Sequence, residues 1–497
     1  MTTSLATVGE ALHGAGRRGR DVTIVDAVHD SRQAAPGALF CAIPGQLADG
    51  HDHAPDAVAR GAAALLVERW LDLDVPQLRV PSVRAAVGPA SAVIHGHPSR
   101  DLAVVGVTGT NGKTTVAALL EGAFGAAARG TGVIGTIATR IHGARLPGVR
   151  TTPEGTDLQR LLRTMHTRGV DAVAMEVSSH GLDLRRVDGV SFTVAVYTNL
   201  SQDHLDWHGS MTAYYHAKRR LFVEDLADRA VVHLDGDWGR RLAAESRIPT
   251  TTVGRDTDAD VRLLEESHDV TGSRGRLVGV TASSGEVDLE VRTGLAGRFN
   301  LENAATAVTA AVEAGVDAEV ARDGVAAAPG VPGRLERVDV PGGVTAFVDY
   351  AHTPDAVTQV VAVLRELVVA GRIVIVLGCG GERDTGKRAP MGAAAVTADV
   401  AVLTSDNPRG EDPAAILAAV ESGARAALAD GAEADLVVEP DRRAAIRTAL
   451  AAARPGDVVV VAGKGHETVQ VIGDERRPFD DRRVLGEIAR ELDGGRR

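Results

Sequence analysis

A chain of 497 residues is too long to form one hydrophobic core, so we expect it to fold into two to four domains. Its hydrophobic content of 44% and charged content of 24% are typical of a soluble globular protein. The formal net charge of -12 argues against a nucleic-acid-binding protein, which needs a concentrated basic surface, but it leaves room for a locally basic site that binds an anionic ligand.

The chain also lacks the usual features of exported and membrane proteins. Its first residues show no charged head followed by an apolar secretion segment, and no stretch approaches the ~18 consecutive apolar residues of a membrane span. Two cysteines, Cys41 and Cys379, are too few for a disulfide framework or a cysteine-rich zinc site. We therefore expect a cytoplasmic enzyme with reduced thiols, no nucleic-acid partner and no membrane insertion.

Apolar, strand-like runs recur along the chain. They lie at residues 63–67, 103–107, 170–177, 193–199, 373–377, 400–404 and 457–461. Helical patterns separate most of these runs, and this order favours an α/β fold with parallel sheets. We predict three domains, at residues 1–100, 101–333 and 334–497.

A glycine-rich loop joins an apolar strand to a helix in the segment 101–124. Glycines allow main-chain N–H groups to converge on phosphate oxygens, Lys113 supplies a mobile positive charge, and Thr114 can approach a bound Mg²⁺. The common P-loop pattern needs glycine at the position of Val107, so the match is to the shorter variant TGTNGKTT. The predicted ATP-binding residues are Gly109, Thr110, Asn111, Gly112, Lys113, Thr114 and Thr115. The loop alone leaves kinases and other NTPases open.

Several further segments resemble the Mur ligase family. The loop variant is typical of Mur ligases and folylpolyglutamate synthetases, and the more specific segments are DSR at 30–32, MEVSSHGL at 175–182, NLSQDHLD at 199–206, LENA at 301–304, DYAHTP at 349–354, DNPR at 406–409 and GKGHE at 463–467. They occur in the family order over nearly the whole chain. The resemblance implies an N-terminal uridine-nucleotide-binding α/β domain, a central P-loop parallel-sheet ATPase domain and a C-terminal Rossmann-like α/β domain.

Within the family, the chain is similar to the ligases that add the third amino acid of the peptidoglycan stem. The resemblance implies that ATP phosphorylates UDP-N-acetylmuramoyl-L-alanyl-D-glutamate (UDP-MurNAc-L-Ala-D-Glu), and that meso-diaminopimelate then attacks the acyl phosphate. A lysine-adding or other Mur-like amide ligase stays open, as does a catalytically inactive Mur-like scaffold. A folylpolyglutamate synthetase fits the loop but not the segment 406–409 or the region of Ser31.

The resemblance also implies the catalytic and metal-binding residues. Lys113, Glu176, His204 and Lys218 would form the catalytic set, and Thr114, Glu176, His204 and Lys218 would hold Mg²⁺. Lys218 would need to be carbamylated by CO₂, because an ammonium group has no acceptor for a metal. The further expected ATP contacts are Asn303, Arg334, Asp349 and His352.

Each of these residues also has an ordinary structural reading. Glu176 could be a buried carboxylate paired with a base, His204 a hydrogen-bonded loop residue, and Lys218 a lysine on a helix surface. Asn303 and Arg334 could serve as helix caps or surface residues.

The nucleotide-sugar peptide is expected to contact hydroxyl groups and one arginine, which suit a ligand rich in phosphate and carboxylate oxygens. The resemblance implies Ser31, Gln46, Leu47, Ala48, Thr151, Thr152, Ser178 and Arg186. Ser31 and Thr151 could instead be turn-capping hydroxyls. Leu184 stands where some family members have glutamine, so one polar substrate contact is in doubt. The segment 233–237 also departs from the family pattern, and we assign it no role.

The segment 406–409 carries the prediction of the added amino acid. In the family this tetrapeptide accompanies meso-diaminopimelate, whose distal carboxylate a planar guanidinium can bind bidentately. The implied contacts are Arg383, Asp406, Asn407, Pro408, Arg409, Gly463 and Glu467. Arg409 could instead form only a structural ion pair, and Lys387 and Arg388 could either line the site or lie on a solvated surface.

Overall fold

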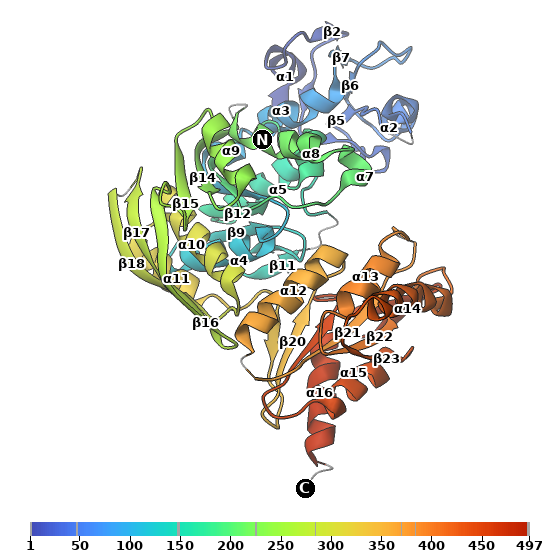
Figure 1. Cartoon of the computed structure of the whole chain (residues 1–497). Coiled ribbons are helices and arrows are strands. Elements are labelled where there is room, and N and C mark those ends of the chain that lie inside the picture. Colours follow the sequence, from blue (N-terminus) through green and yellow to red (C-terminus); the bar gives the residue numbers. More distant parts are fainter. Residues whose placement is uncertain are drawn as a thin grey trace. The chain divides into compact units, whose positions relative to one another are not determined.

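The computed structural model describes residues 2–45, 48–146, 150–223, 226–283, 285–368, 370–382 and 384–494. The chain divides into two compact units, shown in Figure 1. Unit 1 comprises Met1–Glu266, Gly275–Arg292 and Glu302–Ala328, and unit 2 comprises Ser267–Arg274, Thr293–Leu301 and Pro329–Arg497.

The first sheet of unit 1 has five strands in the order β2-β7-β6-β5-β4. Their bounds are β2 (Gly16–Arg18), β4 (Asp26–Val28), β5 (Ala38–Cys41), β6 (Ala64–Val67) and β7 (Gln77–Arg79), with helices α1 (Leu5–Glu10), α2 (Ala54–Ala59) and α3 (Val83–Ile94) and a short pair β1 (Thr3–Ser4) and β3 (Thr23–Ile24). All pairs are parallel except β2 with β7. Helices cover both faces: Leu39 packs in the cluster of α1 and α3, whereas the adjacent Phe40 packs against α2. Strand β5 is therefore apolar at every position.

The second sheet has eleven strands in the order β11-β10-β9-β12-β8-β13-β14-β15-β16-β17-β18. Their bounds are β8 (Ala103–Thr108), β9 (Thr131–Ile134), β10 (Thr139–Ile141), β11 (Ala144–Leu146), β12 (Ala172–Glu176), β13 (Phe192–Tyr197), β14 (Ala227–His233), β15 (Thr250–Gly254), β16 (Val261–Asp269), β17 (Gly272–Thr281) and β18 (Gly285–Thr293). The strands from β9 through β16 in this order run parallel, as predicted, whereas β10 is antiparallel to both of its neighbours.

Helices accompany this second sheet. They are α4 (Lys113–Ala126), α5 (Gly155–Thr167), α6 (Ser179–Asp183), α7 (Leu205–His208), α8 (Met211–Arg219), α9 (Asp237–Glu245), α10 (Arg298–Glu313) and α11 (Ala318–Ala327). The predicted apolar runs at 103–107, 170–177 and 193–199 correspond to β8, β12 and β13. These strands lie in the middle of the sheet and are almost wholly buried, which explains their continuous apolar sequence.

The third sheet lies in unit 2 and has six strands in the order β19-β20-β24-β21-β22-β23. The elements are β19 (Glu336–Val338), β20 (Thr345–Asp349), β21 (Ile373–Cys379), β22 (Val400–Ser405), β23 (Asp435–Val438), β24 (Val458–Ala462), α12 (Pro354–Leu367), α13 (Arg388–Ala395), α14 (Pro413–Ala429), α15 (Arg442–Ala452) and α16 (Asp481–Gly494), with a hairpin β25 (Val469–Ile472) and β26 (Glu475–Pro478). Every pair in the six-stranded sheet is parallel except β19 with β20. Helices α12, α13 and α14 cover one face, and α15 and α16 cover the other.

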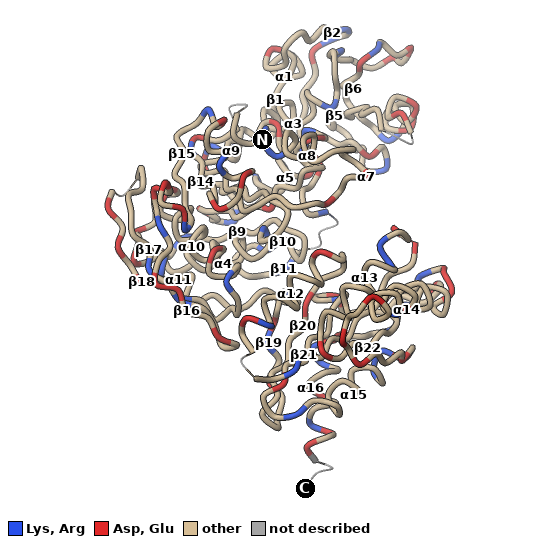
Figure 2. The backbone as a smooth tube through the Cα atoms, in the orientation of Figure 1, with Lys and Arg blue, Asp and Glu red and all other residues tan. Residues whose placement is uncertain are grey.

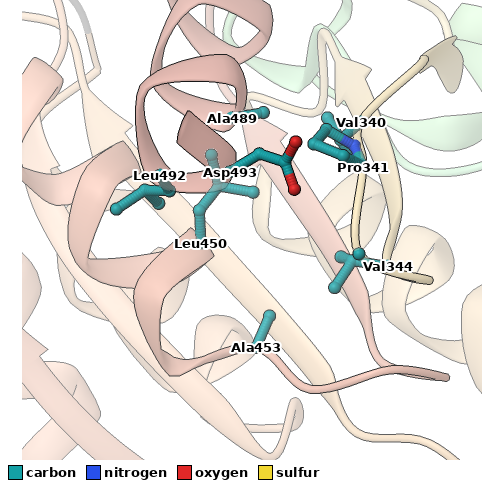
Figure 3. A pocket seen from close by; sticks show the side chains of 9 residues that line it. Val340, Pro341, Val344, Leu450, Ala453, Ala489, Leu492 and Asp493 are labelled. Atoms are coloured by element: carbon teal, nitrogen blue, oxygen red, sulfur yellow. The ribbon is translucent and has the colours of Figure 1, made fainter. Parts of the chain in front are cut away.

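The two cysteines are buried free thiols, and burial raises the pKa of each to about 12. Basic and acidic residues are interleaved along the described backbone (Figure 2). No helix of the described residues is long and apolar enough to cross a membrane. A hollow between the segment 340–344, which precedes β20, and helices α15 and α16 is lined mainly by aliphatic side chains, with Asp493 beside them (Figure 3). It contains none of the residues predicted to bind a substrate.

Candidate functional site

The carboxyl edge of the second sheet gathers the predicted ATP and metal residues of unit 1. Parallel strands end at the same edge, where ligands of α/β proteins usually bind. Glu176 at the end of β12 pairs with Val107 of β8, and Thr108 pairs with Tyr197 of β13. The phosphate loop, Glu176 and the segment that leads to His204 therefore all leave the sheet at this edge.

Two glycines of the loop approach neighbouring atoms too closely for any side chain. A Cβ at Gly109 would lie 1.9 Å from Thr198 Oγ1, and one at Gly112 would lie 2.4 Å from Asn303 Oδ1. Gly112 also has a left-handed φ of 85° where α4 begins. Asn303 is only 6% exposed and lies against the loop, so it is not a surface residue, and its contact with ATP stays a prediction.

Two lysine side chains donate to one main-chain oxygen of the loop. Lys113 Nζ lies 2.9 Å from Gly109 O and 2.8 Å from Thr110 O, and Lys218 Nζ lies 2.8 Å from the same Gly109 O. Lys218 is 1% exposed, so the reading of a helix-surface lysine is wrong. Its Nζ also lies 4.5 Å from the centre of the Tyr214 ring. Burial, followed by the charge of Lys113, lowers the pKa of Lys218 well below its ordinary value.

Glu176 presents its carboxylate to hydroxyl and main-chain donors. It is 1% exposed and accepts hydrogen bonds from Thr114 Oγ1 at 3.0 Å, Thr136 N at 2.9 Å and Thr136 Oγ1 at 3.0 Å. Among the described residues it forms no ion pair with a base, so the structural alternative for Glu176 has no support. The Thr114 hydroxyl and the Glu176 carboxylate form a pair of hard oxygen donors that fits Mg²⁺.

His204 lies in a cluster of histidines beside this site. Its side chain is 46% exposed, its φ is a left-handed 52°, and its Nε2 is 3.4 Å from Asp203 Oδ2. The His180 ring meets it edge-on at 4.7 Å between ring centres. Burial, followed by the nearby His204 and His208, lowers the pKa of His180 to about 4. No hydrogen bond among the described residues links His204 to Glu176 or Thr114, so its role as a ligand stays a prediction.

Three of the predicted substrate hydroxyls are connected to the strand that ends in Glu176. Thr152 Oγ1 donates to Glu176 O at 3.0 Å and lies 3.1 Å from Ser178 Oγ, and Thr151 Oγ1 lies 2.9 Å from Thr136 Oγ1. Ser178 also caps α6. The Thr151 hydroxyl contacts the side chain of Thr136 and does not cap a helix. These residues meet because the segment before α5 runs along the edge of the sheet.

A buried carboxylate that sequence reasoning missed holds Arg186. Glu154 Oε1 lies 2.8 Å from Arg186 Nε, and Glu154 Oε2 accepts from Arg84 Nη1 at 2.6 Å. Arg186 Nη1 donates to Thr152 O at 3.3 Å, and burial lowers the pKa of Arg186. Glu154 lies two residues after the predicted Thr152, and this proximity is the sequence signal that could have indicated it.

The predicted uridine-site residues lie in the first sheet region. Ser31 begins a short 3₁₀ turn whose cap is the side chain of Asp30, so Ser31 is not the capping hydroxyl. Ala48 O accepts from Gly45 N at 2.9 Å. Gln46 and Leu47 lie outside the described residues. Leu184 directly follows α6 as its C-cap.

Unit 2 holds the other three predicted ATP residues close together. Asp349 ends β20 and accepts from Leu335 N at 2.6 Å and Ala351 N at 2.7 Å. Burial raises the pKa of Asp349, and the charge of Arg334 opposes this effect. The Arg334 guanidinium lies 4.8 Å from the centre of the Tyr350 ring, and His352 Nδ1 lies 2.8 Å from Tyr350 O.

The predicted diaminopimelate residues of unit 2 meet at the carboxyl edge of the third sheet. Asp406 and Asn407 follow β22, and Gly463 follows β24. A Cβ at Gly463 would lie 2.7 Å from Asp406 Oδ2, and Asn407 Nδ2 donates to Glu467 Oε2 at 2.6 Å. Pro408 follows Asn407 in the same loop, whereas Arg383 lies outside the described residues. Two segments far apart in sequence thus form one polar cluster, which is largely buried.

Arg409 lies beside this polar cluster in a strained backbone position. Its φ is 52°, and its Nη1 donates to Gly381 O at 2.6 Å. It forms no ion pair with a carboxylate in the part of the chain that the structure describes, so the ion-pair alternative has no support. Lys387 Nζ donates to His352 O at 2.8 Å. Arg388 is buried and lies 2.8 Å from Glu411 Oε2, so the solvated-surface reading is wrong for Arg388.

A separate cluster occupies the segment to which the sequence analysis assigned no role. One ligand atom each of His233, Asp235 and Glu302 lies within 4.8 Å of the others. Arg255 Nη1 lies 3.0 Å from Asp235 Oδ2 and 2.5 Å from Glu302 Oε1. The Arg255 guanidinium therefore pairs with both carboxylates, as it does with Glu266, and the cluster is an ion-pair network around Arg255.

Three Mur ligase family models match the chain, and together they cover most of it. They are described as the Mur ligase family catalytic domain at residues 25–100, the Mur ligase middle domain at residues 107–311 and the Mur ligase glutamate ligase domain at residues 333–465.

Whole-length relatives agree with the family models. Two curated proteins are named UDP-N-acetylmuramoyl-L-alanyl-D-glutamate--2,6-diaminopimelate ligase. The protein of Streptomyces avermitilis is 47% identical over 489 residues, which cover 97% of this chain and 95% of that protein. The protein of Streptomyces coelicolor is 46% identical over 507 residues, with 99% and 97% covered. A solved structure of the same name is 32% identical with a TM-score of 0.71, covering 99% of this chain and 100% of that chain.

These matches confirm the resemblance that the motifs indicated and the three-part α/β architecture that it implied. Similarity at this level over nearly the full length of both proteins leaves no large segment of the chain unaccounted for. The chain belongs to the Mur ligase family.

Proposed function

We propose that the chain is an ATP-dependent ligase that joins meso-diaminopimelate to UDP-MurNAc-L-Ala-D-Glu in peptidoglycan biosynthesis. The observation that carries the proposal is the 47% identity over 97% of the chain to a relative of that name. The polar cluster formed by Asp406, Asn407, Gly463 and Glu467 supports an amino-acid substrate with several charged groups. ATP consumption and a nucleotide-linked substrate support a cytoplasmic location.

The proposed domain boundaries remain residues 1–100, 101–333 and 334–497. The five-stranded and six-stranded sheets each fall inside one of these ranges, as does every strand of the eleven-stranded sheet. Each of the three family matches also lies within one of these ranges, except that the match at residues 333–465 begins one residue before the third range.

Beside the phosphate loop, Mg²⁺ would be held by Thr114, Glu176, His204 and carbamylated Lys218. The close approach of Thr114 Oγ1 and Glu176 Oε2, at 3.0 Å, supports an oxygen-rich site. Bound Mg²⁺ would supply positive charge against the phosphates of ATP. Carbamylation needs a lysine in the neutral amine form, which burial of Lys218 favours, and it turns the amine into an oxygen donor.

The reaction would begin with phosphoryl transfer. A free carboxylate oxygen of D-glutamate attacks the γ-phosphorus, the bond from phosphorus to the bridging oxygen breaks, and ADP leaves with the electron pair. Lys113 would exchange its contacts with Gly109 O and Thr110 O for phosphoryl oxygens, where its charge stabilises the transition state.

Amide formation would follow at the acyl carbon. An amine of diaminopimelate attacks this carbon, the bond to the phosphate oxygen breaks, phosphate leaves, and the nitrogen loses its proton. In unit 2, the Arg409 guanidinium would bind the distal carboxylate of the amino acid, and Glu467 would accept from an ammonium group. Water must be excluded, because it would hydrolyse the acyl phosphate.

The proposal is tested with purified protein, ATP, Mg²⁺ and UDP-MurNAc-L-Ala-D-Glu, with either meso-diaminopimelate or L-lysine added. We expect one ADP and one phosphate per tripeptide product with diaminopimelate, identified by mass. Preferential use of lysine would contradict the assigned amino acid. Absence of phosphate release with either amino acid would instead support an inactive Mur-like scaffold.

A further inference from the structure

Lysine is rare in this chain, and its few copies lie at or beside the proposed sites. Lysine and arginine together number 54, but only Lys113, Lys218, Lys387 and Lys464 are lysines. The other cations of the chain are planar guanidinium groups, whereas an ammonium group is compact and directs three donors around one atom. The proposed function uses Lys113 and Lys218, and Lys464 is the more deeply buried of the remaining two.

Lys464 is fully buried and uses all of its donors inside the proposed amino-acid site. Its side chain is 0% exposed. Its Nζ donates to Val469 O at 2.8 Å, Asn407 Oδ1 at 3.1 Å and Glu467 Oε2 at 3.3 Å, and lies 3.6 Å from Asp406 Oδ1. A buried ammonium group with these partners is both neutralised and held in one place.

These contacts decide the orientation of the Asn407 amide. Asn407 Oδ1 accepts from Lys464 and from Val471 N at 2.9 Å, so its Nδ2 is left to donate to Glu467 Oε2 at 2.6 Å. Oε2 of Glu467 thus receives two donors. Oε1 accepts no hydrogen bond from the described residues, and the Glu467 side chain is 33% exposed. The free oxygen is available to an ammonium group of a substrate.

The ends of the two strands that carry this site are held by a different cation. Arg442 and Asp481 form a fully buried ion pair at 2.7 Å. Arg442 Nη2 donates to Ala462 O at 2.9 Å and its Nη1 donates to Ser405 O at 3.4 Å, which are the last residues of β24 and β22. Arg442 thus holds the ends of the strands, whereas Lys464 contacts the side chains of Asn407 and Glu467 and one main-chain oxygen beyond the strands, Val469 O.

We propose that Lys464 is a positioning residue for the amino-acid substrate. Its ammonium group holds the Asn407 amide and the Glu467 carboxylate in one orientation, so that Glu467 Oε1 faces an ammonium group of diaminopimelate. This inference rests on the proposed function, because it assigns the polar cluster of unit 2 to the amino acid that is joined.

The first test compares Lys464→Met with wild-type enzyme by steady-state kinetics on the full-length protein. Methionine keeps most of the side-chain volume but removes all three donors. We expect KM for diaminopimelate to rise by at least about tenfold, because charged hydrogen bonds are lost, while KM for ATP and for the nucleotide substrate stays within about twofold. Equal rises for all three substrates would show a merely structural role and overturn the inference.

A matched control is available at the opposite end of the same sheet. Arg372 lies before β21 and pairs with Asp457 before β24 at 2.9 Å. Arg372→Met also removes a cation that links two segments of unit 2, and we expect it to lower Tm without changing KM for any substrate. A selective rise of KM for diaminopimelate in this control would overturn the inference.

A double-mutant cycle tests whether Lys464 acts through Glu467. We expect Lys464→Met to raise KM much less in a Glu467→Gln background than in the wild type, because the oriented carboxylate is already lost. Independent, multiplicative effects would contradict the inference. If Lys464→Met does not fold, Lys464→Arg serves instead: a selective rise in KM is expected, and wild-type kinetics would overturn the requirement for a compact ammonium group.

The activity of the wild-type enzyme distinguishes a failure of this inference from a failure of the proposed function on which it rests. A wild-type enzyme that forms no product from diaminopimelate contradicts the proposed function. Normal wild-type turnover, combined with an unchanged KM for diaminopimelate in Lys464→Met, contradicts only the role of Lys464.

Discussion

At the scale of single residues, the phosphate loop brings two ammonium groups onto Gly109 O, one from Lys113 and one from Lys218. Two like charges at one site disfavour each other, and burial adds to the effect at Lys218. Both effects favour the neutral amine, which has the lone pair needed to add CO₂. Burying the Lys218 side chain beside Lys113 therefore costs local stability, and this cost is consistent with a lysine that becomes modified.

This cost predicts a pH-dependent stability. The pKa of Lys218 is lower in the folded protein than the ordinary ~10.4 of an unfolded chain. Between these two pKa values the unfolded state binds more protons than the folded state does, so the free energy of unfolding rises with pH. Lys218→Met removes this penalty. In CO₂-free buffer we expect the inactive variant to have the higher Tm at pH 7, with a gap that narrows toward pH 10. A wild type more stable than the variant at pH 7 would contradict the assigned burial cost.

Glu176 allows a sharper test of the proposed metal site. Glu176→Gln removes one negative charge but keeps an oxygen that can accept from Thr136 or Thr114. We expect kcat to fall by roughly 10²–10³, the range typical for loss of a charge-stabilising group, and stability to fall by only about 1–3 kcal/mol. Kinetics and thermal unfolding measure the two effects separately. A variant with near wild-type kcat would remove Glu176 from the catalytic set.

At the scale of elements, the unit of β8, loop and α4 was predictable because its signals are local. Continuous apolar residues indicate a buried parallel strand, and the glycines and threonines indicate the turn into a helix. The strand found, Ala103–Thr108, extends the predicted run 103–107 by one residue. The loop must also accept Asn303 from α10, and this demand is not local.

The close approach of Asn303 makes Gly112 an element-scale prediction. Gly112→Ala places a Cβ at a φ of 85° and 2.4 Å from Asn303 Oδ1, so we expect a loss of about 1–3 kcal/mol and a raised KM for ATP. Gly125 is the matched control, because it lies within α4 with no atom within 4 Å of an added Cβ. Gly125→Ala is expected to stabilise by about 0.5–1 kcal/mol with unchanged kinetics. Similar kinetic effects in both variants would contradict the role of the contact.

Strands β16, β17 and β18 were missed for a physical reason. In β18, buried Val287, Leu289 and Val291 alternate with exposed charged residues. This is the pattern of a strand with one solvated face, and it differs from the continuous apolar runs on which the strand predictions depended. The alternation could have identified β18 from the sequence.

At the scale of the whole molecule, the two compact units have separate apolar clusters: unit 1 contains the five-stranded sheet and most of the eleven-stranded sheet, and unit 2 contains the six-stranded sheet. Unit 1 contains the phosphate loop, and unit 2 contains the loops after β22 and β24. Domains with separate cores often unfold in separate steps, so a single unfolding midpoint is not expected for this chain.

Scanning calorimetry should therefore resolve more than one transition. Diaminopimelate is expected to raise the midpoint of one transition only, because its proposed contacts lie in unit 2, and a ligand stabilises the part that it binds. Arg409→Leu should abolish this shift while the shift produced by nucleotide persists. One cooperative transition that every ligand moves equally would contradict the assignment of the two sites to separate units.

The sequence by itself determined the family, the α/β class and the identity of most candidate residues, because loops such as 109–115, 406–409 and 463–467 carry their chemistry in a few adjacent positions. It could not decide burial or partners, which depend on segments far apart in the chain. Only the tertiary structure distinguishes Lys218 from a surface lysine, shows that Arg409 contacts a carbonyl oxygen in place of a carboxylate, and brings Lys464 onto Asn407. Packing on both faces of the sheet sets the register of the parallel strands, and the strands end at a common edge. This register decides which side chains meet there.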